Sequence, residues 1–430
     1  MTIVAGLRQR LRQSHYLRDV IWQMSGNGLA QILGVAAMPL LTRLYSPTDF
    51  ATLNLFAQVV AGLTIVLTWR FEYLVMLPKD DIQALAILRF IALAGAAAAT
   101  LATAAAWLAG DRLAGLMGDP ALSTWLVLAP LTAWLVCLSI GLQQAVQRRQ
   151  DFRNAGVSEV LSKGGYVASA LAGTPWLPHI GGLMASTAVA AGAKSLWLWG
   201  VLRAGTRALA HQTPIRAAYA IRAYGRLAGA MSFSNLLAMV TAATPMIFMA
   251  KTYGGETLGQ FGLVVSTLYL PSGLLGNAIG QVYYQRAAQR HGRGEAFDDL
   301  WRTTAWQLAR IGVPLYAVVA LLSPWAYPFV FGHQWQPAGQ YAMLMAVAAG
   351  LSFMTSPLDR TSLVVQVWWY QPLWHAARAV TTVTVVWMAS HWHWAILQFL
   401  SALVAQMSAM YIADWLAGRQ FAARKGIRRG

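Results

Sequence analysis

Apolar runs of about 20 residues recur from Val20 almost to the C-terminus of this 430-residue chain, and that is the length an α-helix needs to cross a bilayer. Only 11% of the residues are charged and 57% are hydrophobic. A soluble globular protein carries about 25% charged residues, and a disordered chain has far fewer large apolar groups. The sequence therefore predicts an all-α, polytopic membrane protein.

Twelve spans of roughly 20 residues can be placed along the chain. They lie near residues 20–41, 53–77, 84–109, 121–143, 156–174, 180–202, 228–250, 258–280, 304–327, 339–357, 373–390 and 394–416. Because their number is even, both termini are expected on the same side of the membrane.

The basic residues indicate which side that is. The chain has 32 Lys and Arg against 15 Asp and Glu. If the N-terminus is cytoplasmic, only Arg43, Arg112 and Lys251 lie in the outer connections, and most other basic residues lie in the inner ones. This bias predicts that both termini are cytoplasmic, as in an inner-membrane protein. The excess of positive charge is thereby explained, and no nucleic-acid partner is expected.

The longest inner connection, 203–227, is rich in arginine and separates two halves of six spans each. The expected organisation is an N-terminal lobe of residues 1–202, a basic cytoplasmic linker of 203–227, and a C-terminal lobe of 228–430 with a basic tail. A shift of 208 residues places Asn27 on Asn235, Tyr45 on Tyr253 and Arg43 on Lys251. Since each half begins in the cytoplasm, the halves are expected to be parallel repeats.

Motifs of catalytic chemistry are missing from the sequence. The single cysteine, Cys137, can form neither a disulfide framework nor a thiolate metal site, and no phosphate-binding glycine loop is present. The outer connections are short, which disfavours a membrane glycosyltransferase or ligase. Asp359 is expected to be solvated in an inner loop. We therefore expect a protein that is not an enzyme and has no metal site and no cofactor.

Four stretches resemble a known family. They are PLLTRLYSPTDFA (39–51), WRFEYLVMLP (69–78), GQVYYQRAAQ (280–289) and FGHQWQPAGQY (331–341). In this order they resemble the polysaccharide transporter branch, with the O-antigen (Wzx-type) flippases, of the multidrug/oligosaccharidyl-lipid/polysaccharide (MOP) superfamily. One departure is Ala51, where the family usually has glycine.

The resemblance implies two six-helix, MATE-like lobes around a central cavity, working by alternating access. The implied cargo is an undecaprenyl-pyrophosphate-linked oligosaccharide, moved from the inner to the outer leaflet for assembly of O-antigen of lipopolysaccharide, capsule or exopolysaccharide. Membrane lipid and polysaccharide polymerase or assembly proteins are the implied partners, and Na⁺ or H⁺ is the candidate coupling ion. The alternative from the same superfamily is an ion-coupled exporter of small molecules.

Charged residues within the spans are the candidate site. A charge at the bilayer centre costs about 2.5–3.5 kcal/mol on insertion scales, so such residues usually face a cavity or a partner. One hypothesis is a cationic vestibule that holds a pyrophosphate or an acidic sugar. The alternative is that these side chains reach the inner membrane surface. The candidates are Arg70, Arg89, Lys163, Lys194 and Arg310.

Four further residues are candidates for polar contacts in the cavity or for ion coupling: Asn27, Glu72, Glu159 and Asn235. On a continuous helix Glu72 would point about 200° away from Arg70, so these two side chains are not expected to pair. Glu159 and Lys163 are four residues apart and are expected to neutralise each other. The two asparagines are expected either to line the interface between the lobes or to form hydrogen bonds between neighbouring helices.

The balance of charges bears on the cargo. An exporter of organic cations is expected to have more buried carboxylates than cations. The spans hold five cations against Glu72, Glu159 and, near the end of the last span, Asp414. This balance favours an anionic cargo.

Overall fold

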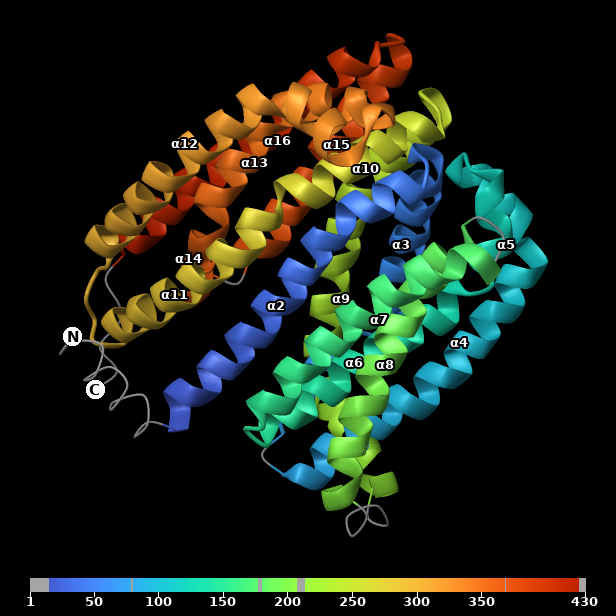
Figure 1. The fold of residues 1–430 in the computed structure, drawn as a ribbon. Coiled ribbons are helices and arrows are strands. Elements are labelled where there is room, and N and C mark those ends of the chain that lie inside the picture. The colour runs from blue at the N-terminus through green and yellow to red at the C-terminus, as the bar shows by residue number, and fades with distance from the viewer. Residues whose placement is uncertain (1–14, 79, 177–179, 207–212, 368, 425–430) are drawn as a thin grey trace, which may run out of the picture. The chain divides into compact units, whose positions relative to one another are not determined.

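The computed structural model describes residues 15–78, 80–176, 180–206, 213–367 and 369–424 (Figure 1). Within these ranges the chain consists of helices and turns, and no strand occurs. Residues 207–212 of the expected linker and 425–430 of the expected basic tail lie outside the described residues.

Thirteen helices of 14 or more residues occur in the described part of the chain, joined by shorter helical turns. They are α2 (His15–Leu44), α3 (Pro47–Thr68), α4 (Asp81–Met117), α6 (Ala129–Arg148), α7 (Phe152–Trp176), α8 (Gly181–Thr206), α9 (Thr213–Thr252), α10 (Gly255–Leu268), α11 (Asn277–Gly292), α12 (Asp298–Phe331), α13 (Gln336–Thr355), α15 (Tyr370–His391) and α16 (Ile396–Ala422).

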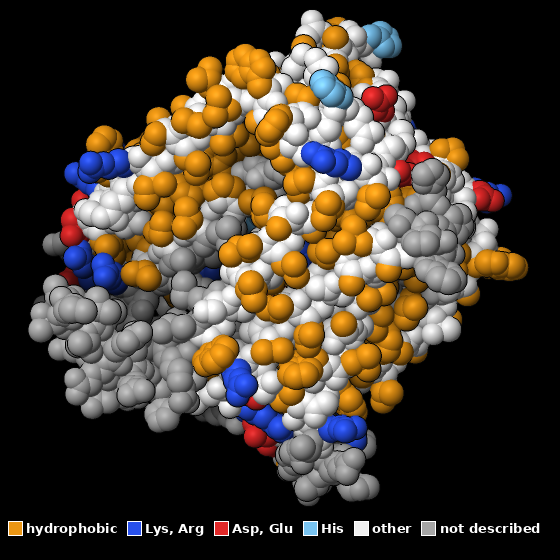
Figure 2. Space-filling view, in the orientation of Figure 1, with side chains coloured by type: hydrophobic (Ala, Val, Ile, Leu, Met, Phe, Trp, Pro, Cys, Tyr) orange, Lys and Arg blue, Asp and Glu red, His pale blue; other side chains and the backbone are white. Residues whose placement is uncertain are grey.

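Each of the twelve predicted spans overlaps at least one of these helices. By length and composition, seven stretches of the described chain are long and apolar enough to cross a membrane. Hydrophobic side chains are spread widely over the face shown in Figure 2, and charged side chains are few among them. The all-α, polytopic fold is confirmed, and the count of twelve spans stays a prediction.

The helices form two compact units. Unit 1 comprises residues 15–44 and 55–236, and unit 2 comprises residues 45–54 and 237–424, in the described part of the chain. Unit 1 therefore contains α2, α4, α6, α7 and α8, with parts of α3 and α9. Unit 2 contains α10 to α16, with the remaining parts of α3 and α9.

Local sequence explains several helix ends. The Asp80 side chain accepts a hydrogen bond from the backbone of Ile82 and caps the start of α4. Gly118 ends that helix at φ 83°, a conformation that glycine adopts without steric penalty. At the start of α3, Ser46 and Asp49 exchange backbone and side-chain hydrogen bonds, which is a reciprocal cap.

The 208-residue shift also relates helix boundaries. α2 ends at Leu44 and α3 begins at Pro47, whereas α9 ends at Thr252 and α10 begins at Gly255. Both boundaries move by the same number of residues as the matched sequence. The two helix pairs thus have the same layout, as repeats of one unit would.

Small residues permit close helix packing within unit 1. A Cβ on Gly26 of α2 would lie 2.5 Å from the backbone of Gly156 in α7. Gly173 of α7 and Gly182 of α8 face each other in the same way. Such pairs allow backbones in a membrane protein to approach closely and gain dispersion contacts.

In unit 2 the predicted span 258–280 is not one helix. α10 ends at Leu268, a π-helical turn covers Ser272–Gly276, and α11 begins at Asn277. Pro271 lies at this break, and proline has no N–H for a helical hydrogen bond. The apolar pattern alone predicts one span here, whereas the structure divides it into two helices near the proline.

Candidate functional site

The turn after α3 creates the first part of the candidate site. The prediction of a helix continuing to residue 77 was wrong, because α3 ends at Thr68. Trp69 and Arg70 follow with positive φ angles of 49° and 62°, and a 3₁₀ turn covers Phe71–Tyr73. A non-glycine residue in this region costs on the order of 1–3 kcal/mol, so surrounding contacts must hold the turn.

Arg70 and Glu72 pair across this turn, contrary to the expectation from a regular helix. Arg70 Nη1 lies 3.4 Å from Glu72 Oε1, and Arg70 Nη2 donates to Asn235 Oδ1 of α9 at 3.0 Å. Glu72 is fully buried and also accepts a hydrogen bond of 2.5 Å from Thr68. The left-handed turn brings the two charges together, which a helix with 100° per residue would not.

One donor of this group remains available. Arg70 Nε is buried and has no hydrogen-bond partner in the described part of the chain. A buried donor of this kind normally has a partner, because leaving it unpaired costs on the order of 1–3 kcal/mol. The Nε of Arg70 can therefore donate one further hydrogen bond, to an anion or to a water.

Arg148, at the end of α6, forms hydrogen bonds to the segment that follows this turn. Its Nη1 donates to the carbonyls of Met76 at 3.2 Å and Pro78 at 2.5 Å, and its Nε donates to Asp81 at 2.8 Å. These charge-assisted bonds are stronger than neutral ones, and they offset part of the cost of the turn.

Three helices of unit 1 form a second polar group. Lys194 of α8 donates to Glu159 Oε1 of α7 at 2.8 Å, and Gln143 of α6 donates to the same oxygen at 2.9 Å. Lys194 is 8% exposed. The expected pairing of Glu159 with Lys163 was wrong, since packing of α8 on α7 brings Lys194 to the carboxylate.

Lys163 instead passes over α2. Its Nζ lies 5.0 Å from the ring centre of Tyr166, in a cation–π arrangement. Its side chain occupies the space that a Cβ on Gly34 would fill, so glycine at position 34 makes room for it.

The other predicted residues lie elsewhere. Asn27 on α2 and Arg89 on α4 are exposed in unit 1, and Arg310 is exposed on α12 in unit 2. Of the nine candidates, the structure thus brings Arg70, Glu72 and Asn235 into one group and Glu159 and Lys194 into another.

Unit 2 contains a polar group that sequence reasoning missed. Tyr370 donates to Asp414 at 2.7 Å, and Gln371 donates to Asp359 at 3.2 Å. Both carboxylates border a cavity of about 10 Å³, the size of one water. Asp359 is half-buried rather than solvated as expected. The sequence signal that could have indicated this group is the adjacent pair Tyr370 and Gln371, whose side chains supply two hydrogen-bond donors for the carboxylates.

Comparison with known proteins identifies the family and the fold. A model of a family described as "Polysaccharide biosynthesis protein" matches residues 40–340. A search of curated proteins finds no match. The chain is similar to the lipid II flippase MurJ in an inward closed conformation, at 12% identity over 94% of this chain and 86% of that one, with a TM-score of 0.65.

Two transporters have similar structures. An inward-facing multidrug resistance MATE family transporter of the MOP superfamily is 14% identical over 93% of this chain and 94% of its own, with a TM-score of 0.58. The Vibrio cholerae MATE transporter VcmN in the bent form is 12% identical over 98% of both chains, with a TM-score of 0.55.

These matches confirm several predictions. The match to the model of a polysaccharide biosynthesis protein family, together with the fold shared with transporters and a flippase, agrees with the prediction that the chain is not an enzyme. At these identities the likeness of structure establishes the fold, and the family model establishes the relationship by sequence. The chain belongs to the polysaccharide biosynthesis protein family, as a multi-pass membrane protein with the fold of the MOP-superfamily transporters.

Proposed function

We propose that this protein is a flippase that moves an anionic, lipid-linked oligosaccharide from the inner to the outer leaflet of the bacterial cytoplasmic membrane. The match to a polysaccharide biosynthesis family is the observation that carries the proposal. The similarity in fold to a flippase of a lipid-linked substrate is consistent with it. In this proposal the carrier is undecaprenyl pyrophosphate, both termini are cytoplasmic, and polymerase or assembly proteins receive the cargo.

In the proposed mechanism, cations of unit 1 bind the phosphates while the lipid tail stays in the bilayer. Arg70 is the first candidate, because its guanidinium is preorganised by Glu72 and Asn235 and still has a free Nε donor. A guanidinium held in this way suits phosphate oxygens, since charge-assisted hydrogen bonds are strong and directional. Lys194 is the second candidate. Rocking of two lobes would then expose the bound phosphates to alternate sides.

A deletion strain tests the proposal. Loss of the gene should leave lipid-linked oligosaccharide on the inner leaflet and abolish surface polysaccharide. Wild-type protein should restore both, whereas Lys194→Gln should restore less than about a tenth of the polymer, since a buried charge contact to the cargo is lost. Leaflet-resolved extraction of the lipid-linked sugar and an assay of surface polymer give the two readings.

Arg112→Gln provides the matched control, because Arg112 is an exposed cation of α4 outside both polar groups. It should restore transport like the wild type, and immunoblots of membranes check that all variants accumulate equally. Intact surface polymer and unchanged lipid-linked sugar in the deletion strain, with no second flippase present, would favour the small-molecule exporter instead.

Coupling to Na⁺ or H⁺ is a further part of the proposal. Buried carboxylates are present in both units, namely Glu72 and Asp414, and such groups can exchange a proton or a small cation. In vesicles containing the purified protein, an imposed gradient of the coupling ion should raise the transport rate several-fold. Equal rates with and without pH and Na⁺ gradients would exclude coupling to either ion.

A further inference from the structure

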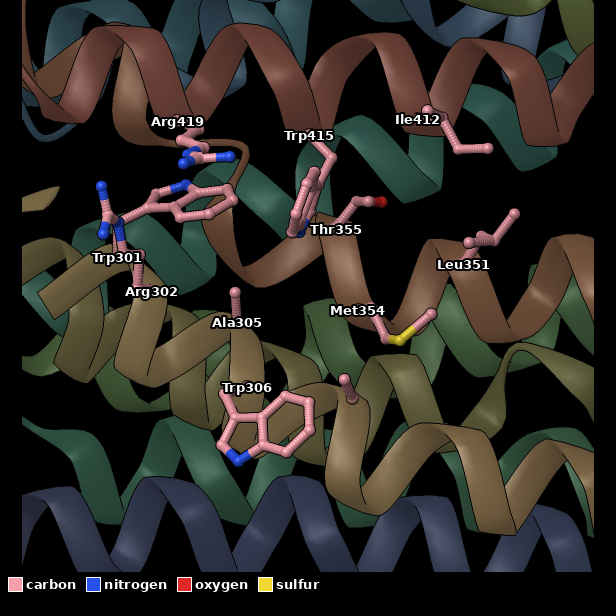
Figure 3. A pocket seen from close by; sticks show the side chains of 11 residues that line it. Trp301, Arg302, Ala305, Trp306, Leu351, Met354, Thr355, Ile412, Trp415 and Arg419 are labelled. Atoms are coloured by element: carbon pink, nitrogen blue, oxygen red, sulfur yellow. The ribbon is translucent and has the colours of Figure 1, made fainter. Parts of the chain in front are cut away.

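Unit 2 contains a large cavity that the proposed transport mechanism does not use. It lies between α12, α13 and α16, and its volume is about 590 Å³ (Figure 3). That volume is within the range of roughly 300–1,000 Å³ that is usual for binding sites of small ligands. All of its lining residues belong to unit 2. We call it the α12–α16 groove.

The α12–α16 groove is charged at one end and apolar at the other. Figure 3 shows Arg302 and Arg419 at one end beside Trp301, with Leu351 and Ile412 toward the other end. The two arginines come from the start of α12 and the end of α16. The Arg302 side chain is 61% exposed and makes one long contact of 3.4 Å with Asp298, so its guanidinium is accessible to a ligand.

Helical spacing produces this polarity. On α12, Arg302, Ala305 and Ala309 follow one another at three and four residues, and on α16 Ile412, Trp415 and Arg419 do the same. Residues at this spacing share one face of a helix. Each helix therefore places a guanidinium at the same end of an apolar stripe.

Aromatic rings form the wall below the arginines. Trp301 is 1% exposed and its ring centre lies 4.9 Å from that of Trp415. Trp306, one turn further along α12, is 71% exposed and borders the groove from the outside. Tryptophans at the level of lipid headgroups, with arginines above them, are typical of a membrane interface.

We propose that the α12–α16 groove binds an anionic phospholipid of the bilayer. The phosphate of the headgroup is held between Arg302 and Arg419, and an acyl chain lies along the apolar stripe past Ala309 to Ile412. Basic pockets between membrane helices bind anionic headgroups through this combination of charge and apolar contact. Bound lipid would join α12 to α16 and so stabilise unit 2.

The groove favours a phospholipid over the lipid-linked cargo for two reasons. The side chains of Arg302 and Trp306 at its border are exposed, so phospholipids of a surrounding bilayer can reach it. Arg302 shares its charge with Asp298, so the two guanidiniums and this one carboxylate together carry a single net positive charge, which balances the single negative charge of a phosphate diester. This inference goes beyond the proposed function, because it requires no transport and holds whatever the cargo is.

Native mass spectrometry of the purified full-length protein tests the proposal. The protein is titrated with phosphatidylglycerol or with phosphatidylcholine of the same acyl chains, and the bound lipids are counted. Wild-type protein should retain phosphatidylglycerol about 30-fold more strongly, as expected for two arginines near a headgroup. The double variant Arg302→Gln with Arg419→Gln should lose this preference.

The matched control is Arg286→Gln with Arg293→Gln, which removes the same charge from exposed positions of unit 2 outside the groove. It should keep the preference. Ala309→Phe, which fills the groove but leaves both arginines, should reduce retention of both lipids. Size-exclusion chromatography checks that each variant is folded.

Three results would overturn the proposal. First, the preference for phosphatidylglycerol could survive in the Arg302 and Arg419 variant. Second, the preference could disappear equally in the control variant, which would make it an effect of the protein's overall charge. Undecaprenyl phosphate at equal concentration could also displace phosphatidylglycerol from the wild-type protein, which would make the groove a cargo site.

Discussion

Replacing Arg70 by alanine should lower the free energy of unfolding of this protein by about 3–5 kcal/mol, the usual effect of removing one partner of a buried ion pair. Glu72 is fully buried, and its carboxylate would keep the hydrogen bond from Thr68 but lose the guanidinium. The left-handed turn at residues 69 and 70 would also lose its link to Asn235. Heating followed by size-exclusion chromatography measures the lower midpoint of unfolding.

The double variant Arg70→Gln with Glu72→Gln separates stability from transport. It leaves no unpaired charge, so most of the lost stability should return. If Arg70 binds the cargo as proposed, surface polymer should still be absent. Arg112→Ala, which removes an exposed arginine of α4, is the control for both measurements. Equal loss of stability in the single and double variants would contradict the argument that the unpaired Glu72 charge is the cause.

Gly26→Leu should prevent unit 1 from folding. A Cβ at this position would meet the backbone of Gly156 at 2.5 Å, and backbone atoms cannot move aside as a flexible side chain can. Overpacking costs about 1–3 kcal/mol where side chains can adjust, and a clash with backbone costs more. The yield of monodisperse protein from membranes measures the effect.

Gly28→Leu, on the same helix, is the matched control. A Cβ on Gly28 would have no heavy atom within 4 Å. Both substitutions change a glycine of α2 to leucine, so they alter helix propensity and hydrophobicity equally. Normal yield of the Gly28 variant with loss of the Gly26 variant is expected. A normal yield of Gly26→Leu would show that α2 and α7 do not pack at this glycine pair.

Helix formation could be predicted from local sequence at most positions. The apolar runs are long enough to cross a bilayer only as helices, because backbone groups in lipid must be hydrogen-bonded internally. Predicted boundaries were less accurate where turns intervene. At Trp69 and Arg70 no glycine or proline marks the end of α3, and at Pro271 the apolar pattern continues through a break.

For the polar groups, too, the sequence identified the residues, and the tertiary structure determined their partners. Sequence alone identified Arg70, Glu72, Glu159 and Lys194 as charges that need partners within an apolar chain. It assigned the partners incorrectly, because spacing along one helix was the only geometry available. Arg70 reaches Asn235, 165 residues away, and Glu159 reaches Lys194, 35 residues away.

The sequence by itself thus determined the all-α membrane class, the candidate charges and the resemblance to the polysaccharide transporter family, since each depends on composition, on hydrophobic runs or on short motifs. Only the tertiary structure decided which charges pair, where glycine is required, and that α12 and α16 enclose a groove with two arginines at one end. The physical reason is that a helix is stabilised by bonds four residues apart, whereas an ion pair or a groove depends on which helices pack together.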